Sequence, residues 1–249
     1  MIEVSTEFFA GIECLHAAPT GKRDEPLPTI LFYHGFTSSK EVYSYFGVAL
    51  ALAGFRVILP DADMHGARYN GDSEYRLSHF WEILKSNIDE VPQLIASLRQ
   101  QNLIEGTRLA AAGASMGGMT ALGAMARYPC FTSVACLMGS GYYMSLSHTL
   151  FPPLAVHTPE QAQAFAQRMA PLADYDISRQ LEKIADRPLL IWHGEADEMV
   201  PVAESVRLEK ALREAKLDAG LTFLTEQGIG HRITPSALEA TTAFFKRHL

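Results

Sequence analysis

A serine flanked by glycines is the first feature of the sequence that could do chemistry. Ser115 lies in the stretch GASMGG, between Gly113 and Gly117, and satisfies the pattern G-x-S-x-G. An apolar run precedes it and small residues follow, so the serine lies at a predicted strand-to-helix turn. Glycines at these two positions let the backbone reverse without a Cβ atom striking either element. Two interpretations compete: a tight turn required only for packing, or an elbow that exposes one hydroxyl.

A serine hydroxyl is a weak nucleophile at neutral pH and requires a base that a third group orients. Among nine histidines, His231 is the best placed base, because it follows the last predicted strand and precedes the final predicted helix. Asp197 lies three residues past the end of another predicted strand and is the candidate acid, with Glu195 and Glu198 as competitors. The pattern predicts a catalytic Ser-His-Asp set in the chain order Ser115, Asp197 and His231.

Five further histidines lie away from the ends of the predicted strands. We expect them in the edge hairpin, in loops, in the 141–185 segment or on the terminal helix, where a surface role or a contact with substrate is the alternative to catalysis: His16, His79, His148, His157 and His248.

A tetrahedral intermediate also needs hydrogen-bond donors for its oxyanion. The residue after the nucleophile supplies one backbone N–H, here that of Met116 at a helix N-terminus, where the helix dipole adds to the stabilisation. The second donor should come from the turn after LFYHG, where Gly35 permits a bend and the Phe36 N–H can face the cleft. The choice of Phe36 depends on its position alone.

The elements that must position these groups alternate along the chain. A hairpin over 1–19 precedes six predicted strands, and helices are predicted between most of them. Ser38 and Glu41 fit a capping box for the first helix, which Gly54 ends, and Pro92 predicts a kink in the second. The predicted strands cover 28–35, 55–61, 107–115, 131–140, 187–194 and 221–228; the helices follow residue 38 and cover about 80–98, 116–127, 202–216 and 234–249.

Such alternation predicts an α/β protein with a mostly parallel sheet and helices on both faces. Ligands bind such sheets beyond the carboxyl ends of the strands, which is where the candidate serine, acid and histidine all lie. The 141–185 segment breaks the alternation with four prolines and short helical patterns, and we expect a small helical cap within a single domain of residues 1–249.

Two groups of residues are candidates for binding substrate. The first group follows the predicted strand 131–140 and would line an acyl pocket or form the core of the cap. Its members are Tyr142, Tyr143, Met144, Leu146, Leu150 and Phe151. In the polar loop after residue 61, Arg68 and Tyr69 would hold a polar or acidic group of a substrate or lie exposed.

Composition narrows the classes of protein. The 249 residues are 48% apolar and 20% charged, as in ordinary globular proteins, and the formal net charge is −7 with no run of like charges. We therefore expect no nucleic-acid partner and no membrane partner, since both need clustered Lys and Arg. Cys14, Cys130 and Cys136 match no metal or redox motif, so we expect no metal site, free thiols, and a cytoplasmic protein without a signal peptide or membrane span.

The motifs together carry a family resemblance. LFYHGF, GASMGG, IWHGEADEMVP and GIGH, in this order, resemble the α/β-hydrolase superfamily, and more narrowly the small bacterial carboxylesterases related to dienelactone hydrolases and to prolyl oligopeptidase catalytic domains. The resemblance covers the chain from about residue 25 onward. It implies an eight-stranded sheet with one antiparallel strand near the N-terminal edge and activity without a cofactor. Position by position, Ser115, Asp197 and His231 match the triad, and Phe36 and Met116 match the oxyanion donors.

The match has particular features and departures. PDADMHGAR is similar to the superfamily's D-x-x-x-H-G loop, which implies that His65 and Gly66 shape the wall of the site. Dienelactone hydrolases use a cysteine nucleophile, so their substrate does not transfer to a chain with serine. Prolyl oligopeptidases carry a propeller domain, for which 249 residues leave no room.

The function expected is hydrolysis of short- to medium-chain carboxylic esters through an acyl-enzyme. The partner is a small-molecule ester, and the chain is a monomer or a small homo-oligomer. A thioesterase or a small-peptide amidase would use the same triad, and a ligand-binding protein without turnover is the alternative outside enzymes. An intact Ser, Asp and His set argues against that last alternative.

Overall fold

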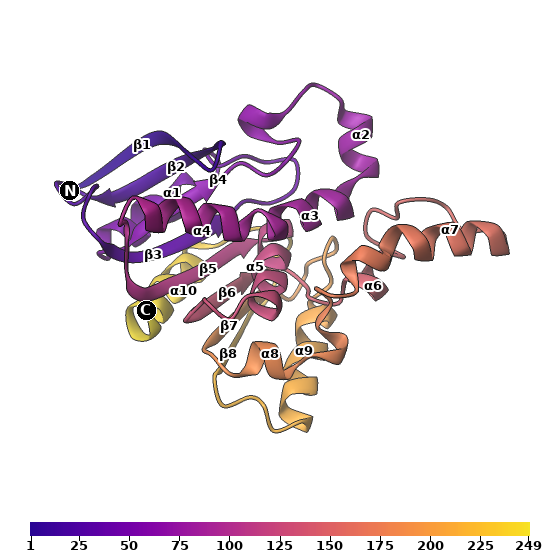
Figure 1. Cartoon of the computed structure of the whole chain (residues 1–249). Helices are drawn as coiled ribbons and strands as arrows, with labels where there is room; N and C mark the ends of the chain where they lie inside the picture. Colours follow the sequence, from indigo (N-terminus) through magenta and orange to yellow (C-terminus); the bar gives the residue numbers. More distant parts are fainter.

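A computed structural model describes residues 1–249 as a twisted sheet with helices on both faces (Figure 1). The sheet has eight strands in the spatial order β1-β2-β4-β3-β5-β6-β7-β8. Their bounds are β1 Ile2–Phe9, β2 Ile12–Pro19, β3 Leu27–Tyr33, β4 Arg56–Pro60, β5 Ile104–Ala114, β6 Ser133–Leu137, β7 Leu189–Gly194 and β8 Leu221–Glu226.

The direction of the strands confirms the expected fold. β2 pairs antiparallel with both β1 and β4, whereas the pairs from β4 through β3, β5, β6 and β7 to β8 are all parallel. The single reversed strand lies near the N-terminal edge of the sheet. The carboxyl ends of β3 to β8 therefore meet at one edge of the sheet, and the loops that follow them can share one site.

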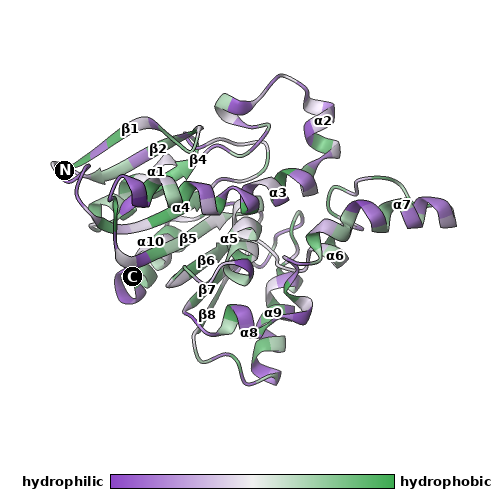
Figure 2. Ribbon diagram, in the orientation of Figure 1, coloured by the Kyte–Doolittle hydropathy of each residue, from purple (hydrophilic) through white to green (hydrophobic).

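Helices cover the two faces of the sheet and bury its apolar strands. The core on one face includes residues of α1 (Ser44–Leu52) and α10 (Pro235–His248). The core on the other face includes residues of α3 (Phe80–Asp89), α4 (Val91–Gln100), α5 (Met116–Arg127) and α9 (Val202–Glu214). Figure 2 shows hydrophobic residues gathered on the central strands, as expected for parallel strands buried on both faces.

Three local predictions need correction. Ser38 and Glu41 do not cap the first helix: α1 begins at Ser44 after Tyr43, because the residues from 34 to 43 form a loop. The expected long helix with a kink is two helices, since α3 ends at Asp89 and Pro92 lies in the first turn of α4. The polar loop before it contains a short helix, α2 (Ser73–Ser78), which Asp72 caps through the Tyr75 N–H.

The 141–185 segment contains only short helices. They are α6 (Tyr143–Leu146), α7 (Pro159–Met169) and α8 (Glu182–Ala185), with single 3₁₀ turns at η2 (Ala170–Leu172) and η3 (Ile177–Arg179); a further turn, η1 (Gly66–Arg68), follows β4. α7 has a complete capping box of Thr158 and Gln161 and projects from the body on the side opposite the N-terminus (Figure 1).

No helix in the chain combines the length and the apolar character that a membrane crossing requires.

Candidate active site

Ser115 occupies a strained turn between β5 and α5. Its backbone has φ 57° and ψ −120°, a conformation that costs a non-glycine residue energy and persists only where the surroundings impose it. A Cβ atom on Gly117 would lie 2.0 Å from the Tyr33 carbonyl oxygen, and one on Gly113 would lie 2.3 Å from the Gly117 carbonyl. Both glycines therefore allow α5 to begin directly against β3 and β5, which turns the serine side chain toward the loops.

The structure brings the three candidate triad residues together at the carboxyl edge of the sheet. His231 Nε2 lies 2.8 Å from Ser115 Oγ, and His231 Nδ1 lies 2.7 Å from Asp197 Oδ2. The imidazole can thus accept the hydroxyl proton on one nitrogen while the carboxylate holds the other N–H. This is the arrangement by which a base activates an alcohol for attack on a carbonyl.

Asp197 is buried and held from several sides. Its Oδ1 accepts hydrogen bonds from the Met199 and Val200 N–H groups, and Oδ2 lies 3.3 Å from His193 Nε2. Burial disfavours the charged carboxylate, but the contacts from His193 and His231 and the Val200 N–H outweigh it and hold the pKa of Asp197 well below its usual range. The acid therefore stays ionised throughout the neutral range, as an orienting group must.

Two backbone N–H groups are available beside Ser115. Met116 is the first residue of α5, a position whose N–H has no acceptor within its own helix. Phe36 lies in the loop after β3, lines the same cavity as Ser115, and makes no hydrogen bond through its backbone N–H. Both donors are thus placed where a carbonyl attacked by Ser115 could rest its oxygen.

Ser115 and His231 open onto a cavity of about 410 Å³. Eleven of its sixteen lining residues are hydrophobic. Besides Ser115 and His231, they are Gly35, Phe36, Thr37, Val42, Tyr43, Tyr45, Phe80, Met138, Leu150, Phe151, Met199, Val200, Arg232 and Ile233. The cavity has the size and the apolar lining of a small-molecule site.

The first group of predicted substrate residues divides. Leu150 and Phe151 line the cavity, and the Phe151 ring packs against those of Phe36 and Phe80 with centroids 4.9 Å apart in both pairs. Tyr142 and Tyr143 do not line it and pack in the core instead, which was the alternative for this group. Tyr143 is fully buried and donates a hydrogen bond to the Met119 carbonyl, while Tyr142 is covered by the Arg207 guanidinium, 3.6 Å from its ring centroid.

The second group, Arg68 and Tyr69, does not line the cavity, and both side chains have partners elsewhere. Arg68 forms a two-pronged ion pair with Glu90, at 2.6 and 2.9 Å, which uses the donors that a substrate would need. Tyr69 lies under the Arg76 guanidinium, 4.3 Å from its ring centroid. Both side chains fasten the segment after β4 to the helices beside it.

Sequence reasoning missed several residues of the site. Val42, Tyr43 and Tyr45 line the cavity from the loop before α1 and its first turn, where a helix was expected instead. The sequence pattern marks His193 only as the end of a strand, whereas in the structure it contacts the candidate acid. Its place at the end of β7, four residues before Asp197, was the available signal, because the ends of parallel strands gather at one edge.

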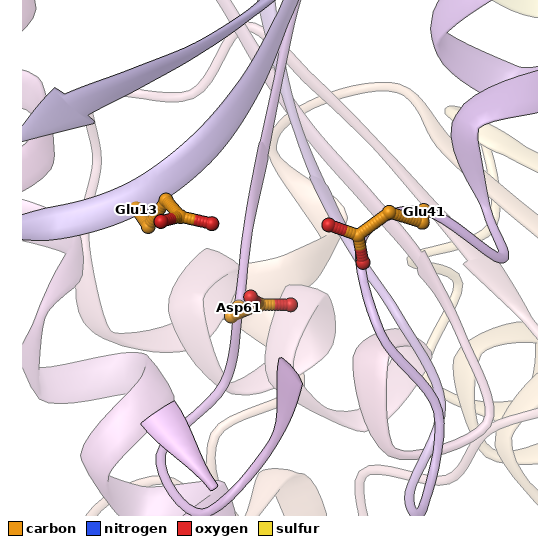
Figure 3. A group of neighbouring side chains, drawn as sticks. All are labelled: Glu13, Glu41 and Asp61. Carbon is orange, nitrogen blue, oxygen red and sulfur yellow. The ribbon is translucent and has the colours of Figure 1, made fainter. Parts of the chain in front are cut away.

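One acidic cluster lies close to the site and could suggest a metal. The carboxylates of Glu13, Glu41 and Asp61 come from three segments and lie within 4.8 Å of one another (Figure 3). The buried Lys40 ammonium contacts all three, at 2.8 Å from Glu13 and Glu41 and 2.5 Å from Asp61. An internal cation thus occupies the place that a metal ion would take.

The site defines a class of protein: an α/β-hydrolase with a serine at the strand-to-helix turn. The chain matches the model of the prolyl oligopeptidase family over residues 49–249. It is 51% identical over 249 residues to Esterase YjfP of Escherichia coli K12, and 33% identical over 257 residues to YitV of Bacillus subtilis 168, with 100% of both chains covered in each case. The solved structure of TT1662 from Thermus thermophilus has a TM-score of 0.78 at 25% identity and covers 99% of this chain and 98% of that one.

The chain therefore belongs to the prolyl oligopeptidase family. It is a serine hydrolase that acts on esters.

The first prediction concerns the turn at Ser115. Gly117→Ala should lower the free energy of unfolding by about 3 kcal/mol, because the new Cβ atom would push α5 away from β3. Chemical denaturation measures this change. Gly47→Ala is the matched control, since its Cβ would meet side-chain atoms rather than backbone, at 3.1 Å from Leu59 Cδ1 and 3.3 Å from Ala17 Cβ, and we expect a change within about 1 kcal/mol. Equal stability of Gly117→Ala and the native protein would contradict this account of the turn.

The second prediction concerns a buried histidine beside the site. Burial lowers the pKa of His65 to about 4, whereas an unfolded histidine titrates near 6.5. As the pH falls from 6.5 to 4, His65 binds a proton in the unfolded chain but stays neutral in the folded protein. The free energy of unfolding should therefore fall by about 3 kcal/mol because of this group. Denaturation at a series of pH values should show a smaller decline in His65→Gln, and equal declines would contradict the prediction.

Proposed function

We propose that this protein hydrolyses short- to medium-chain carboxylic esters through an acyl-enzyme, with Ser115 as nucleophile, His231 as base and Asp197 as orienting acid. The observation that carries the proposal is the continuous hydrogen-bonded path from Ser115 Oγ through His231 to Asp197, at 2.8 and 2.7 Å. This path ends at an apolar cavity that is large enough for a small ester.

The first half-reaction transfers the acyl group to the enzyme. His231 Nε2 removes the Ser115 proton as Oγ attacks the ester carbonyl, and the resulting oxyanion rests on the N–H groups of Phe36 and Met116. Asp197 holds the Nδ1–H and stabilises the imidazolium that forms. The imidazolium then protonates the leaving alcohol, the carbon–oxygen bond of the ester breaks, and the acyl group stays on Ser115.

The second half-reaction releases the acid by the same steps in reverse order. Water takes the place of the alcohol, His231 accepts its proton, and the hydroxide adds to the acyl carbonyl. The same two N–H groups hold the second oxyanion. Collapse of this intermediate returns the proton to Ser115 Oγ and frees the carboxylic acid.

The cavity supports an ester rather than a peptide as substrate. Its walls are mostly apolar, and Arg232 is the one formally charged side chain that lines it. A free amino terminus would need a carboxylate there, and the lining offers none. A thioester or a small amide could still use the same triad, so a panel of ester, thioester and anilide substrates with equal acyl groups separates these activities. We expect the ester to have the highest kcat/KM.

We also propose that the protein is cytoplasmic and a monomer or a small homo-oligomer. Support for a reducing compartment comes from Cys14, Cys130 and Cys136, which are all free thiols, the first and the last of them buried. Burial raises the pKa of both buried thiols to about 12, so neither is a ready nucleophile.

The third prediction tests the triad. Ser115→Ala and His231→Ala should each lower kcat for a short p-nitrophenyl ester by about 10³-fold or more, since the residues of a triad act as a unit. A fluorophosphonate probe should label the native protein at Ser115 and should not label Ser115→Ala. Near-native turnover by Ser115→Ala, with a native circular dichroism spectrum, would end the assignment.

The fourth prediction tests the acyl site. Phe151→Ala removes a ring from the cavity wall, so the ratio of kcat/KM for an octanoyl ester over an acetyl ester should rise by about 10-fold. Kinetics with a series of acyl lengths measures the ratio. Phe165→Ala is the control, because it removes a ring from the same 141–185 segment: Phe165 is buried, whereas Phe151 is partly buried, and Phe165 does not line the cavity. An unchanged ratio in Phe151→Ala would place the acyl group elsewhere.

A further inference from the structure

Two loops beside the site are joined by hydrogen bonds that the proposed reaction does not use. The oxyanion loop, residues 34–43, connects β3 to α1 and carries the Phe36 N–H. The β4 loop, residues 61–67, follows the neighbouring strand. The side chains that join the loops are almost completely buried: His34, Lys40, Asp61 and His65 are each at most 2% exposed.

The peptide group between Gly35 and Phe36 is held by His34. The Ala62 N–H donates to His34 Nε2 at 3.0 Å, so the proton of the neutral ring is on Nδ1, which donates to the Gly35 carbonyl at 2.8 Å. In a trans peptide the Phe36 N–H points opposite to the Gly35 carbonyl, and the chain contains no cis peptide. The hydrogen bond to His34 thereby aims the Phe36 N–H away from the His34 ring.

The next peptide group is held by His65. The Thr37 N–H donates to His65 Nε2 at 2.9 Å, and His65 Nδ1 donates to the Asp63 carbonyl at 2.7 Å. Thr37 has φ +60°, an unfavourable conformation for a β-branched residue that needs such an external partner. With His34 on one side and His65 on the other, both peptide groups of Phe36 have fixed orientations.

Asp61 fixes the far end of the oxyanion loop. Its carboxylate accepts from the Lys40 backbone N–H at 3.0 Å, from Lys40 Nζ at 2.5 Å and from the Ala67 N–H at 2.9 Å. Gly66 has φ +50°, and a Cβ atom there would lie 2.2 Å from this carboxylate. The β4 loop is therefore shaped around Asp61, and Asp61 in turn holds the oxyanion loop.

We propose that the β4 loop positions the oxyanion site, with His65 and Asp61 acting as positioning residues that keep the Phe36 N–H directed at the reacting carbonyl. Neither side chain touches substrate, since neither lines the cavity. The inference depends on the proposed function, because it assigns a role to the Phe36 donor of that mechanism. It adds that this donor works only while a second, separate loop holds it.

A positioning role differs measurably from a role in stability alone. The developing oxyanion is present in the transition state and not in the bound ester, so a misdirected donor lowers kcat and leaves KM nearly unchanged. A misdirected donor also weakens the binding of trifluoromethyl ketone inhibitors, because these form a tetrahedral adduct with the serine. A purely structural side chain would change the melting temperature without either effect.

The experiment compares three variants with the native enzyme. His65→Leu should lower kcat for p-nitrophenyl butyrate by about 10- to 100-fold, with KM within about 3-fold, because a misdirected donor costs less than the loss of about 10²- to 10³-fold that follows removal of one donor. The inhibition constant of a trifluoromethyl ketone should rise by a similar factor. His65→Gln, whose side-chain oxygen can accept from the Thr37 N–H, should recover most of both losses.

His16→Leu is the matched control for removing a buried histidine. His16 is 2% exposed and accepts a hydrogen bond from Arg56 at 2.8 Å, but it lies on β2 outside the cavity. The His16→Leu substitution should lower the melting temperature. At a temperature where the variant is folded, its kcat and its inhibition constant should stay within about 2-fold of the native values. A His65→Leu variant that behaves in this way would overturn the proposal.

A second route avoids dependence on one variant. If His65→Leu does not fold, His65→Asn offers a second variant: its shorter side chain places the amide oxygen nearer the backbone than His65 Nε2, out of reach of the Thr37 N–H, and it should show the same loss of kcat at unchanged KM. Native kcat in folded His65→Asn would overturn the proposal as well. Ser115→Ala distinguishes failure of the proposed function from failure of this inference. If Ser115→Ala retains turnover, the proposed function fails. If Ser115→Ala is inactive but His65→Leu is fully active, only the positioning role of His65 is refuted.

Discussion

One imidazole ring joins parts of the chain that are far apart in sequence. His231 contacts Ser115 across 116 residues and Asp197 across 34, and both hydrogen bonds must exist at once for the serine to lose its proton. Few structures could maintain such a contact on loops alone. Here each partner lies within three residues of the end of a strand of the same sheet, so the hydrogen bonds between strands set the distances that the chemistry requires.

The backbone around Ser115 has an energetic cost that packing offsets. The residue adopts a positive φ because α5 begins immediately after β5 and lies against β3, a packing that only Gly113 and Gly117 permit. Strain of this kind persists where neighbours over-determine the conformation. The close contact between helix and strand is thus both the cause of the exposed hydroxyl and the reason that the turn tolerates no larger residue.

Buried polar side chains support the site from behind. His193 and the N–H groups of Met199 and Val200 hold Asp197. The Lys40–Asp61 ion pair, together with His34 and His65, joins the loops after β3 and β4. Each such group is satisfied by a specific partner, since a buried polar atom without one would cost free energy. Apolar packing alone would be compatible with several conformations of these loops, whereas directional hydrogen bonds are compatible with only one.

The sequence by itself determined the fold and the order of the site, because strand–helix alternation and a G-x-S-x-G turn are local patterns with a fixed geometric meaning. It predicted Ser115, Asp197 and His231 from their places after strands. Only the tertiary structure decided which side chains face the cavity: Leu150 and Phe151 do, whereas Tyr142 and Tyr143 turn into the core and Arg68 binds Glu90. Loop side chains choose between such neighbours by contacts that are distant in sequence, so no local pattern records the outcome.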